Sequence, residues 1–112
     1  MPVEKWSEQV SVARLGDDPQ FTDDLQTLQD EMEQRGINAV LDFSSVHFIN
    51  SSNIARLLRL RKRAVSSELK LILCSISTQL WGTFLTTGLD KVFEFRENVP
   101  TALATLQIST NQ

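Results

Sequence analysis

The stretch AVLDFSSVHFINSSNIARLLRLRKRA, residues 39–64, joins a buried strand to an amphipathic helix. Its opening run, residues 39–41, is continuously apolar, which is typical of a strand covered on both faces. A helix is predicted from Ser51 or Ser52 to about Ser66, because apolar residues recur there at helical spacing. Ser and Asn accept hydrogen bonds from the free N–H groups of a first helical turn, so they are favoured as caps at this point. The apolar face of this helix is predicted to contain Ile54, Leu57, Leu58, Ala64 and Val65.

Strands and helices alternate on both sides of this stretch. Alternating or continuous apolar residues predict further strands at residues 3–6, 9–16, 69–76 and 91–95. Apolar spacings of three and four predict further helices at residues 19–35, from a cap at Ser77 or Thr78 to Gly88, and at residues 98–107. This order predicts an α/β layer structure with helices packed on the sheet and right-handed crossovers. The polar tail after Gln107 is predicted to fray.

The composition fits one domain, expected to span residues 1–112, with a real hydrophobic core. The sequence is 41% apolar and 22% charged, as in ordinary globular proteins. A net charge of −3 gives no general attraction to nucleic acid, so a protein or small-molecule partner is expected. No apolar run has the length of a signal peptide or a membrane span, which predicts a cytoplasmic protein without membrane insertion. The single cysteine, Cys74, predicts neither a disulfide nor a zinc site.

Charge is separated between two of the predicted helices. The first helix has an exposed acidic face, formed by Asp23, Asp24, Asp30, Glu31 and Glu33. The second has a basic series, formed by Arg56, Arg59, Arg61, Lys62 and Arg63. Such a series is most often the solvated side of an amphipathic helix. Docking of an acidic surface, or self-association to a homodimer, is the alternative that the pattern leaves open.

Several single residues have simple structural interpretations. His47 lies in a loop, where a structural role is favoured over a catalytic one. Asp42 is predicted to end a strand and to hydrogen-bond the following loop, and Cys74 is predicted to be a small core residue. In the third helix, Leu80 and Phe84 share one stripe and are predicted to pack in the core. Trp81 and Leu85 exceed what one helix face buries, so part of that set is predicted to be exposed.

The order of these segments resembles the STAS domain family, shared by sulphate transporters and bacterial anti-sigma factor antagonists. The resemblance covers most of the chain. It rests on the first strand, the acidic helix and the turn at Gly36, followed by residues 39–64. Residues 39–64 match the family's pattern of an apolar strand, an Asp, an apolar loop, the motif Asp-Ser-Ser-Gly and a helix. LKLILCSIS and TTGLDKVFEF resemble its later segments. The resemblance implies a STAS-like mixed sheet of about four or five strands with about four helices packed on it.

The resemblance also implies a phosphorylation switch. In the antagonist branch, a partner kinase that is also the anti-sigma factor phosphorylates the second serine of the motif, which is Ser52 here. The unphosphorylated domain binds the anti-sigma factor and the phosphorylated domain releases it, so a phosphatase is a further implied partner. The expected partner-binding residues are Asn50, Ser51, Ser52, Asn53 and Arg56. Asn50 replaces the family's Asp and Asn53 its Gly.

Other functions remain as alternatives from the sequence. A scaffold or interaction subunit of the same fold, within a signalling or transport complex, would use these residues without phosphorylation. A serine hydrolase would need Ser51 or Ser52 beside His47, but no GxSxG elbow is present. Nucleotide binding would need a Gly-rich loop, and the chain has only four glycines. We therefore expect a regulatory protein with no enzymatic activity, no catalytic residue, no cofactor and no metal.

Overall fold

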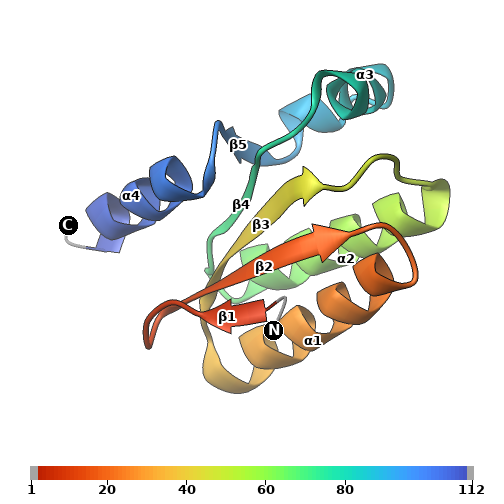
Figure 1. Cartoon of the computed structure of the whole chain (residues 1–112). Helices are drawn as coiled ribbons and strands as arrows, with labels where there is room; N and C mark the ends of the chain where they lie inside the picture. The colour runs from red at the N-terminus through yellow and green to blue at the C-terminus, as the bar shows by residue number, and fades with distance from the viewer. Residues whose placement is uncertain (1–2, 111–112) are drawn as a thin grey trace.

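The computed structural model describes residues 3–110, with side chains described as far as Gln107. Within these residues the chain forms a five-stranded sheet in the order β1, β2, β3, β4, β5 (Figure 1). The strands are β1 (Val3–Lys5), β2 (Val10–Gly16), β3 (Asn38–Ser45), β4 (Leu71–Cys74) and β5 (Glu94–Arg96). The helices are α1 (Gln20–Arg35), α2 (Ser51–Ser66), α3 (Thr78–Thr86), the 3₁₀ helix η1 (Leu89–Lys91) and α4 (Val99–Thr110). None of the helices in the described part is long and apolar enough to cross a bilayer.

The sheet is mixed, as the resemblance implied. β1 runs antiparallel to β2, and β2, β3, β4 and β5 are parallel to one another. Parallel neighbours need a crossover connection, and the intervening helices supply it. The predicted central parallel strand is therefore confirmed as β3, which lies between β2 and β4.

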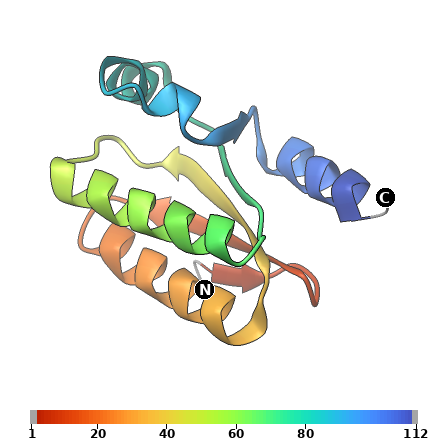
Figure 2. The same cartoon turned by 180° about the vertical axis from the view of Figure 1, so that it is seen from behind.

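Two hydrophobic cores cover the two faces of this sheet. The larger core packs α1, α2 and α3 against one face, and Figures 1 and 2 show α4 on the opposite side. The smaller core joins α4 to the other face through Val10, Val12, Val40, Ile72, Cys74, Ala102 and Leu106. Residues 39–41 of β3 are completely buried, because alternate side chains enter opposite cores.

Aromatic rings link α3 to the central strand and the edge strand. Phe84 of α3 is fully buried and lies edge-on to Phe43 of β3, with ring centroids 6.1 Å apart. On its other side it lies 5.3 Å from Phe95 of β5. Trp81, one turn earlier, stacks edge-on to Phe95 at 4.9 Å. Leu80 is buried and Leu85 is 52% exposed, which confirms both expectations for this helix.

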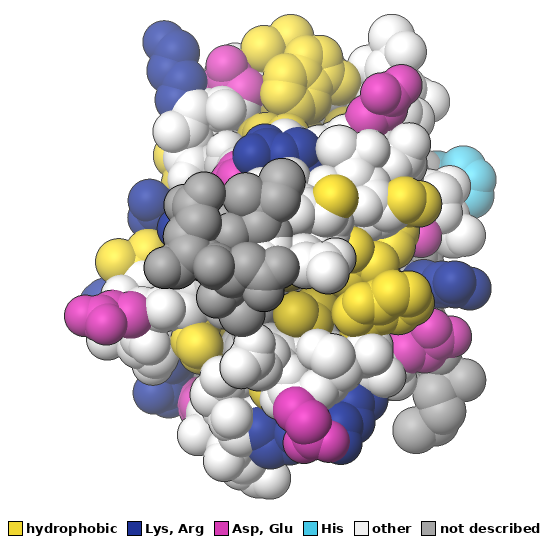
Figure 3. Space-filling view, turned by 90° about the vertical axis from the view of Figure 1, so that its left-hand side faces the viewer, with side chains coloured by type: hydrophobic (Ala, Val, Ile, Leu, Met, Phe, Trp, Pro, Cys, Tyr) yellow, Lys and Arg dark blue, Asp and Glu magenta, His cyan; other side chains and the backbone are white. Residues whose placement is uncertain are grey.

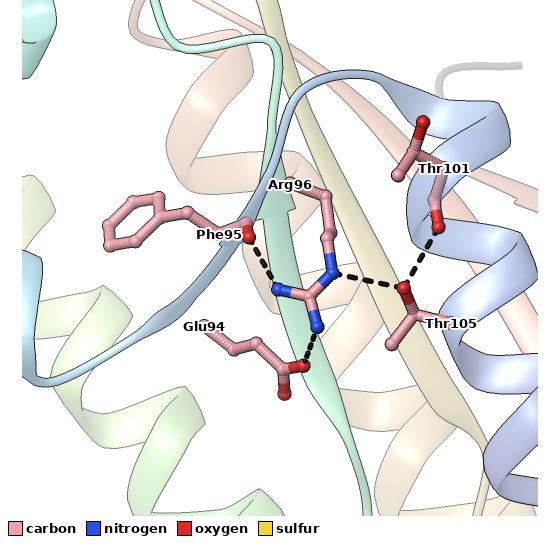
Figure 4. Close-up of polar contacts among 5 residues, drawn as sticks. All are labelled: Glu94, Phe95, Arg96, Thr101 and Thr105. Carbon is pink, nitrogen blue, oxygen red and sulfur yellow. Dashed lines mark hydrogen bonds and ion pairs between the residues drawn. The ribbon is translucent and has the colours of Figure 1, made fainter.

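Arg96 fastens α4 to the edge strand. Its guanidinium donates to the Thr105 hydroxyl of α4 at 2.9 Å, to the Phe95 carbonyl at 2.6 Å and to the Glu94 carboxylate at 2.7 Å (Figure 4). Thr105 in turn donates to the carbonyl of Thr101 at 3.0 Å. One planar side chain thus connects the last helix to both a strand carbonyl and a strand carboxylate.

The predicted bounds of the last two strands need correction. Residues 91–95 do not form one strand, because the chain after Gly88 tightens into η1, where the Val92 N–H donates to the Leu89 carbonyl. The strand begins only at Glu94. The strand predicted at residues 69–76 ends at Cys74, since Ser75 has a φ of 62°, which leaves the extended region. The last helix continues past Gln107 to Thr110.

The two charged helices also differ from their predicted faces. Asp24 of α1 is only 5% exposed, because it lies within one turn of the buried Phe21 and Leu28. In α2 the buried residues are Asn53, Leu57, Leu60 and Ala64, at successive spacings of four, three and four. Leu58 and Val65 each lie about 100° around the helix from that stripe, and both are exposed.

Replacing Phe84 by alanine should lower the free energy of unfolding by about 3–5 kcal/mol, because it leaves a cavity among buried rings. Leu85→Ala is the matched control, since the neighbouring side chain is half exposed, and should cost less than about 1 kcal/mol. Urea denaturation of both variants measures the difference. Equal losses would contradict the assignment of the α3 core face.

Candidate functional site

Two loops meet at the carboxyl end of the parallel strands. The loop after β2 contains Asp17, Asp18 and Pro19, and the loop after β3 contains residues 46–50. The β2–β3 ladder reaches Gly16 opposite Ser45, so both chains leave the sheet at neighbouring positions. In α/β sheets this edge is where ligands and partners are commonly bound.

A reciprocal pair of asparagines begins α2. The Asn53 N–H donates to the Asn50 side-chain oxygen at 2.8 Å, and the Asn50 N–H donates to the Asn53 side-chain oxygen at 3.0 Å. Asn50 is therefore the cap, and the pair forms a capping box. Capping of α2 by the serine side chains, the local interpretation of the sequence, is wrong, because the asparagines already occupy that role.

Asn53 also connects the helix to the other loop. Its side-chain nitrogen donates to the Asp18 carboxylate at 2.7 Å, and the Asn53 residue is only 3% exposed. The hydroxyl and N–H of Thr22 donate to the same carboxylate at 2.7 Å and 3.0 Å. These donors, with Asn53 the strongest, lower the pKa of Asp18, and the charge of Arg56 adds a smaller effect. Asn53 thus turns toward Asp18 and Asn50.

A second pair joins the same loops through His47. The His47 N–H donates to one Asp17 carboxylate oxygen at 2.9 Å, and the ring Nδ1 lies 2.9 Å from the other. Both hydrogen bonds lower the pKa of Asp17, the backbone bond most. Among the described residues, the only hydrogen-bond partner of the His47 side chain is the Asp17 carboxylate.

The two serines are left free by this arrangement. Ser51 and Ser52 are exposed, and neither hydroxyl makes a hydrogen bond within the described part of the chain. They occupy the first two positions of α2, where backbone N–H groups have no partner within the helix and the helix dipole is positive. Arg56 is half-buried one turn further on. All five predicted site residues therefore belong to one helix start, with Asn53 buried beneath its surface.

Phe48 and the two aspartates are parts of this site that the sequence reasoning missed. Phe48 is 67% exposed, between the His47 contact and the capping box. An apolar residue in a short loop gives no sequence signal of exposure. Asp17 and Asp18 do have a signal, since they directly follow a predicted strand, and parallel strands end at the same edge of a sheet.

Other candidate residues lie apart from this edge or inside the sheet. Asp42 is 8% exposed within β3, not at its end, and accepts a hydrogen bond from the Ser44 N–H at 2.9 Å. Cys74 is fully buried, and burial raises the pKa of its thiol to about 11. No three His, Cys, Asp or Glu side chains of residues 3–107 gather closely enough to hold a metal ion.

Comparison with known proteins places this arrangement among relatives of the same architecture. Residues 19–102 match the STAS domain. An RsbS variant from Moorella thermoacetica has 17% identity and a TM-score of 0.85, covering 99% of this chain and 97% of its own. An anti-sigma-factor antagonist (STAS) domain protein from Planctomyces limnophilus has 21% identity and a TM-score of 0.79, covering 94% and 97%. The phosphorylated form of the Bacillus cell fate determinant SpoIIAA has 17% identity and a TM-score of 0.72, covering 93% and 96%. No curated protein is detectably similar to the chain in sequence.

Removing the cap should destabilise the fold. Asn50→Ala leaves the Asn53 N–H without its acceptor and should lower the free energy of unfolding by about 1–2 kcal/mol. Ser51→Ala, at the next position, should change it by less than about 0.5 kcal/mol, because that hydroxyl has no partner. Chemical denaturation compares the two. A larger loss in Ser51→Ala than in Asn50→Ala would contradict the assigned cap.

Asn53→Gly should raise the pKa of Asp18 toward its ordinary value, because the main donor to the carboxylate is removed. The Asp18 pKa is lowered on folding, so its carboxylate stabilises the fold above about pH 4, and this contribution is lost as the pH falls through the folded value. The variant should therefore lose less stability than the wild type on acidification below that pH.

Carboxyl-carbon NMR titration measures the pKa directly, and thermal melts at acid pH measure the stability. Asp17 is the internal control, because its donors from His47 are untouched and its pKa should remain lowered. An unchanged Asp18 pKa in Asn53→Gly would contradict the assigned bond.

Proposed function

The chain belongs to the STAS domain family, and we propose that it is an anti-sigma factor antagonist, switched by phosphorylation of Ser52. Its partner would be an anti-sigma factor with serine kinase activity. The observation that carries the proposal is the free hydroxyl of Ser52, exposed on the first turn of α2 and not used by the cap. Structural relatives named as anti-sigma factor antagonists, one of them in a phosphorylated form, support this class of function.

Local electrostatics suit a phosphate at this position. The first-turn N–H groups and the positive end of the helix dipole favour negative charge on Ser52. Arg56 lies four residues on, a spacing that places two side chains on the same helix face. Asn50 has no charge where the family has Asp, so it does not repel the phosphate. The Asp18 carboxylate is already held by Asn53 and Thr22.

Phosphorylation would change the surface without refolding it. A phosphate adds a charge of about −1.5 to −2, so a partner surface that fits a neutral hydroxyl would meet desolvation and charge repulsion. The capping box does not involve Ser52, and α2 would therefore keep its start. The proposed binding surface is formed by Ser51, Ser52, Arg56 and the exposed Phe48. Phe48 supplies an aromatic anchor of the kind that contributes strongly at protein interfaces.

A STAS scaffold or interaction subunit without phosphorylation is the second candidate. The neutral Asn50–Asn53 pair favours it, because this helix start is fixed entirely by groups that no kinase modifies. In that case the same surface would bind a partner permanently. The two candidates differ in the effect of negative charge at Ser52.

Incubation with ATP and a kinase encoded near this gene should add a single phosphate to the chain, measured by intact mass. Ser52→Ala should abolish the addition, and Ser51→Ala should retain it, since the proposal assigns only the second serine. Phosphate that persists in Ser52→Ala would rule out the assignment.

Partner binding separates the two candidates. Ser52→Asp, which imitates part of the phosphate charge, should weaken binding of the anti-sigma factor by about tenfold or more, a loss of about 1.4 kcal/mol. Ser52→Asn is the uncharged control of similar size and should bind more tightly than Ser52→Asp. Equal affinity of the wild type and Ser52→Asp would favour the scaffold.

A further inference from the structure

The second helix has an unusual charge distribution. Five of the eleven lysines and arginines of the chain fall within residues 56–63, although the net charge of the whole chain is −3. No Asp or Glu occurs anywhere in α2. Surface helices commonly contain both acidic and basic residues, whose charges neutralise each other at spacings of four residues. Figure 3 shows such intermixing of both signs on the side of the molecule where α4 ends.

The neighbouring elements neutralise only part of this charge. Arg63 pairs with Glu33 of α1 at 2.7 Å. The Arg61 side chain lies away from Glu33 and donates to the Val92 carbonyl, just before β5, at 2.8 Å. Arg59 and Lys62 are exposed and have no ion pair within the part of the chain that the structure describes. Among the described residues, Arg63 is thus the one member of the basic series with an ion pair, and Arg59 and Lys62 are unpaired cations beside it.

These cations line a groove between α1 and the second half of α2. The groove has a volume of about 380 Å³ and is lined by Gln29, Arg59, Lys62, Arg63, Ser66 and Ser67. Figure 2 shows the two helices side by side over one face of the sheet, with their outer surfaces turned away from it. Arg59 lies seven residues after Ser52, or about 10 Å along the helix axis, so the groove is distinct from the helix start.

We propose that this groove is a docking site for an acidic segment of a protein partner. The lining offers long cationic side chains, a side-chain amide and two hydroxyls, which are suited to carboxylates spaced along a peptide. A free phosphate fits less well. A phosphate is held best by several free backbone N–H groups, and those in the second half of α2 are already bonded within the helix. The inference goes beyond the proposed function, because it involves neither Ser52 nor a phosphate.

Exposed charge pairs contribute little one at a time, about 0–1 kcal/mol each, and salt screens them. Binding to the groove should therefore be weak, specific for negative charge and sensitive to ionic strength. Reversing both unpaired cations removes their attraction and adds repulsion, so affinity should fall by about tenfold or more.

A peptide of alternating glutamate and glycine serves as the probe, and a glutamine–glycine peptide of equal length as its neutral control. Each is titrated into isotope-labelled full-length chain, and NMR shift changes give the affinity and the residues affected. The acidic peptide should shift Gln29, Ser66, Ser67 and the Arg59 side chain, and the neutral peptide should not.

Arg59→Glu with Lys62→Glu should lose the binding. Lys70→Glu with Lys91→Glu is the matched control, since both lysines are exposed outside the groove and the net charge changes equally. The control should keep its affinity within about twofold.

Three results would overturn the proposal. The first is equal weakening in both double variants, which would show only a general charge effect. The second is displacement of the peptide by an equal concentration of pyrophosphate, which would assign the groove to a phosphate ligand. The third is a wild-type dimer in sedimentation that the Arg59→Glu, Lys62→Glu variant lacks, which would assign the groove to a second copy of this chain.

Discussion

The burial of β3 on both faces is the constraint on which the rest of the structure depends. Its residues 39–41 contribute side chains alternately to the two cores, so the helices on one face and α4 on the other must both be in place. This double burial fixes the register of the strand with β2 and β4. The loop that leaves β3 therefore starts from a rigid position, next to the loop that leaves β2. The candidate site is built at that meeting point.

At the site, two side-chain amides hold the start of α2 in place. Asn50 caps α2, and Asn53 returns the hydrogen bond while its side-chain nitrogen reaches Asp18. One buried asparagine thus ties a helix start to a loop on another strand. The outcome is a hydrogen-bonded support with an exposed surface, on which Phe48 of the loop and the two serines of α2 are presented.

The order and type of the elements could be predicted from the sequence, because apolar periodicity reports burial directly. The Leu80 and Phe84 stripe of α3 and the turn at Gly88 that follows this helix are examples. The end of β4 and the start of β5 could not be predicted from the sequence. They are set by a positive φ at Ser75 and by a 3₁₀ turn, which are decided by local geometry. The sequence indicates where the site lies but not which contacts form it. Which asparagine oxygen caps the helix, and that Asn53 reaches Asp18, depends on contacts between residues 35 positions apart.

The arginines beside the last strand have a consequence for the behaviour of the chain in a crowded cell. A strand at the border of a sheet offers unpaired carbonyls on which a strand of another molecule can add. Arg96 occupies the Phe95 carbonyl, and Arg61 occupies the Val92 carbonyl just before the strand. With two acceptors taken and β5 only three residues long, this border is a poor template for strand addition.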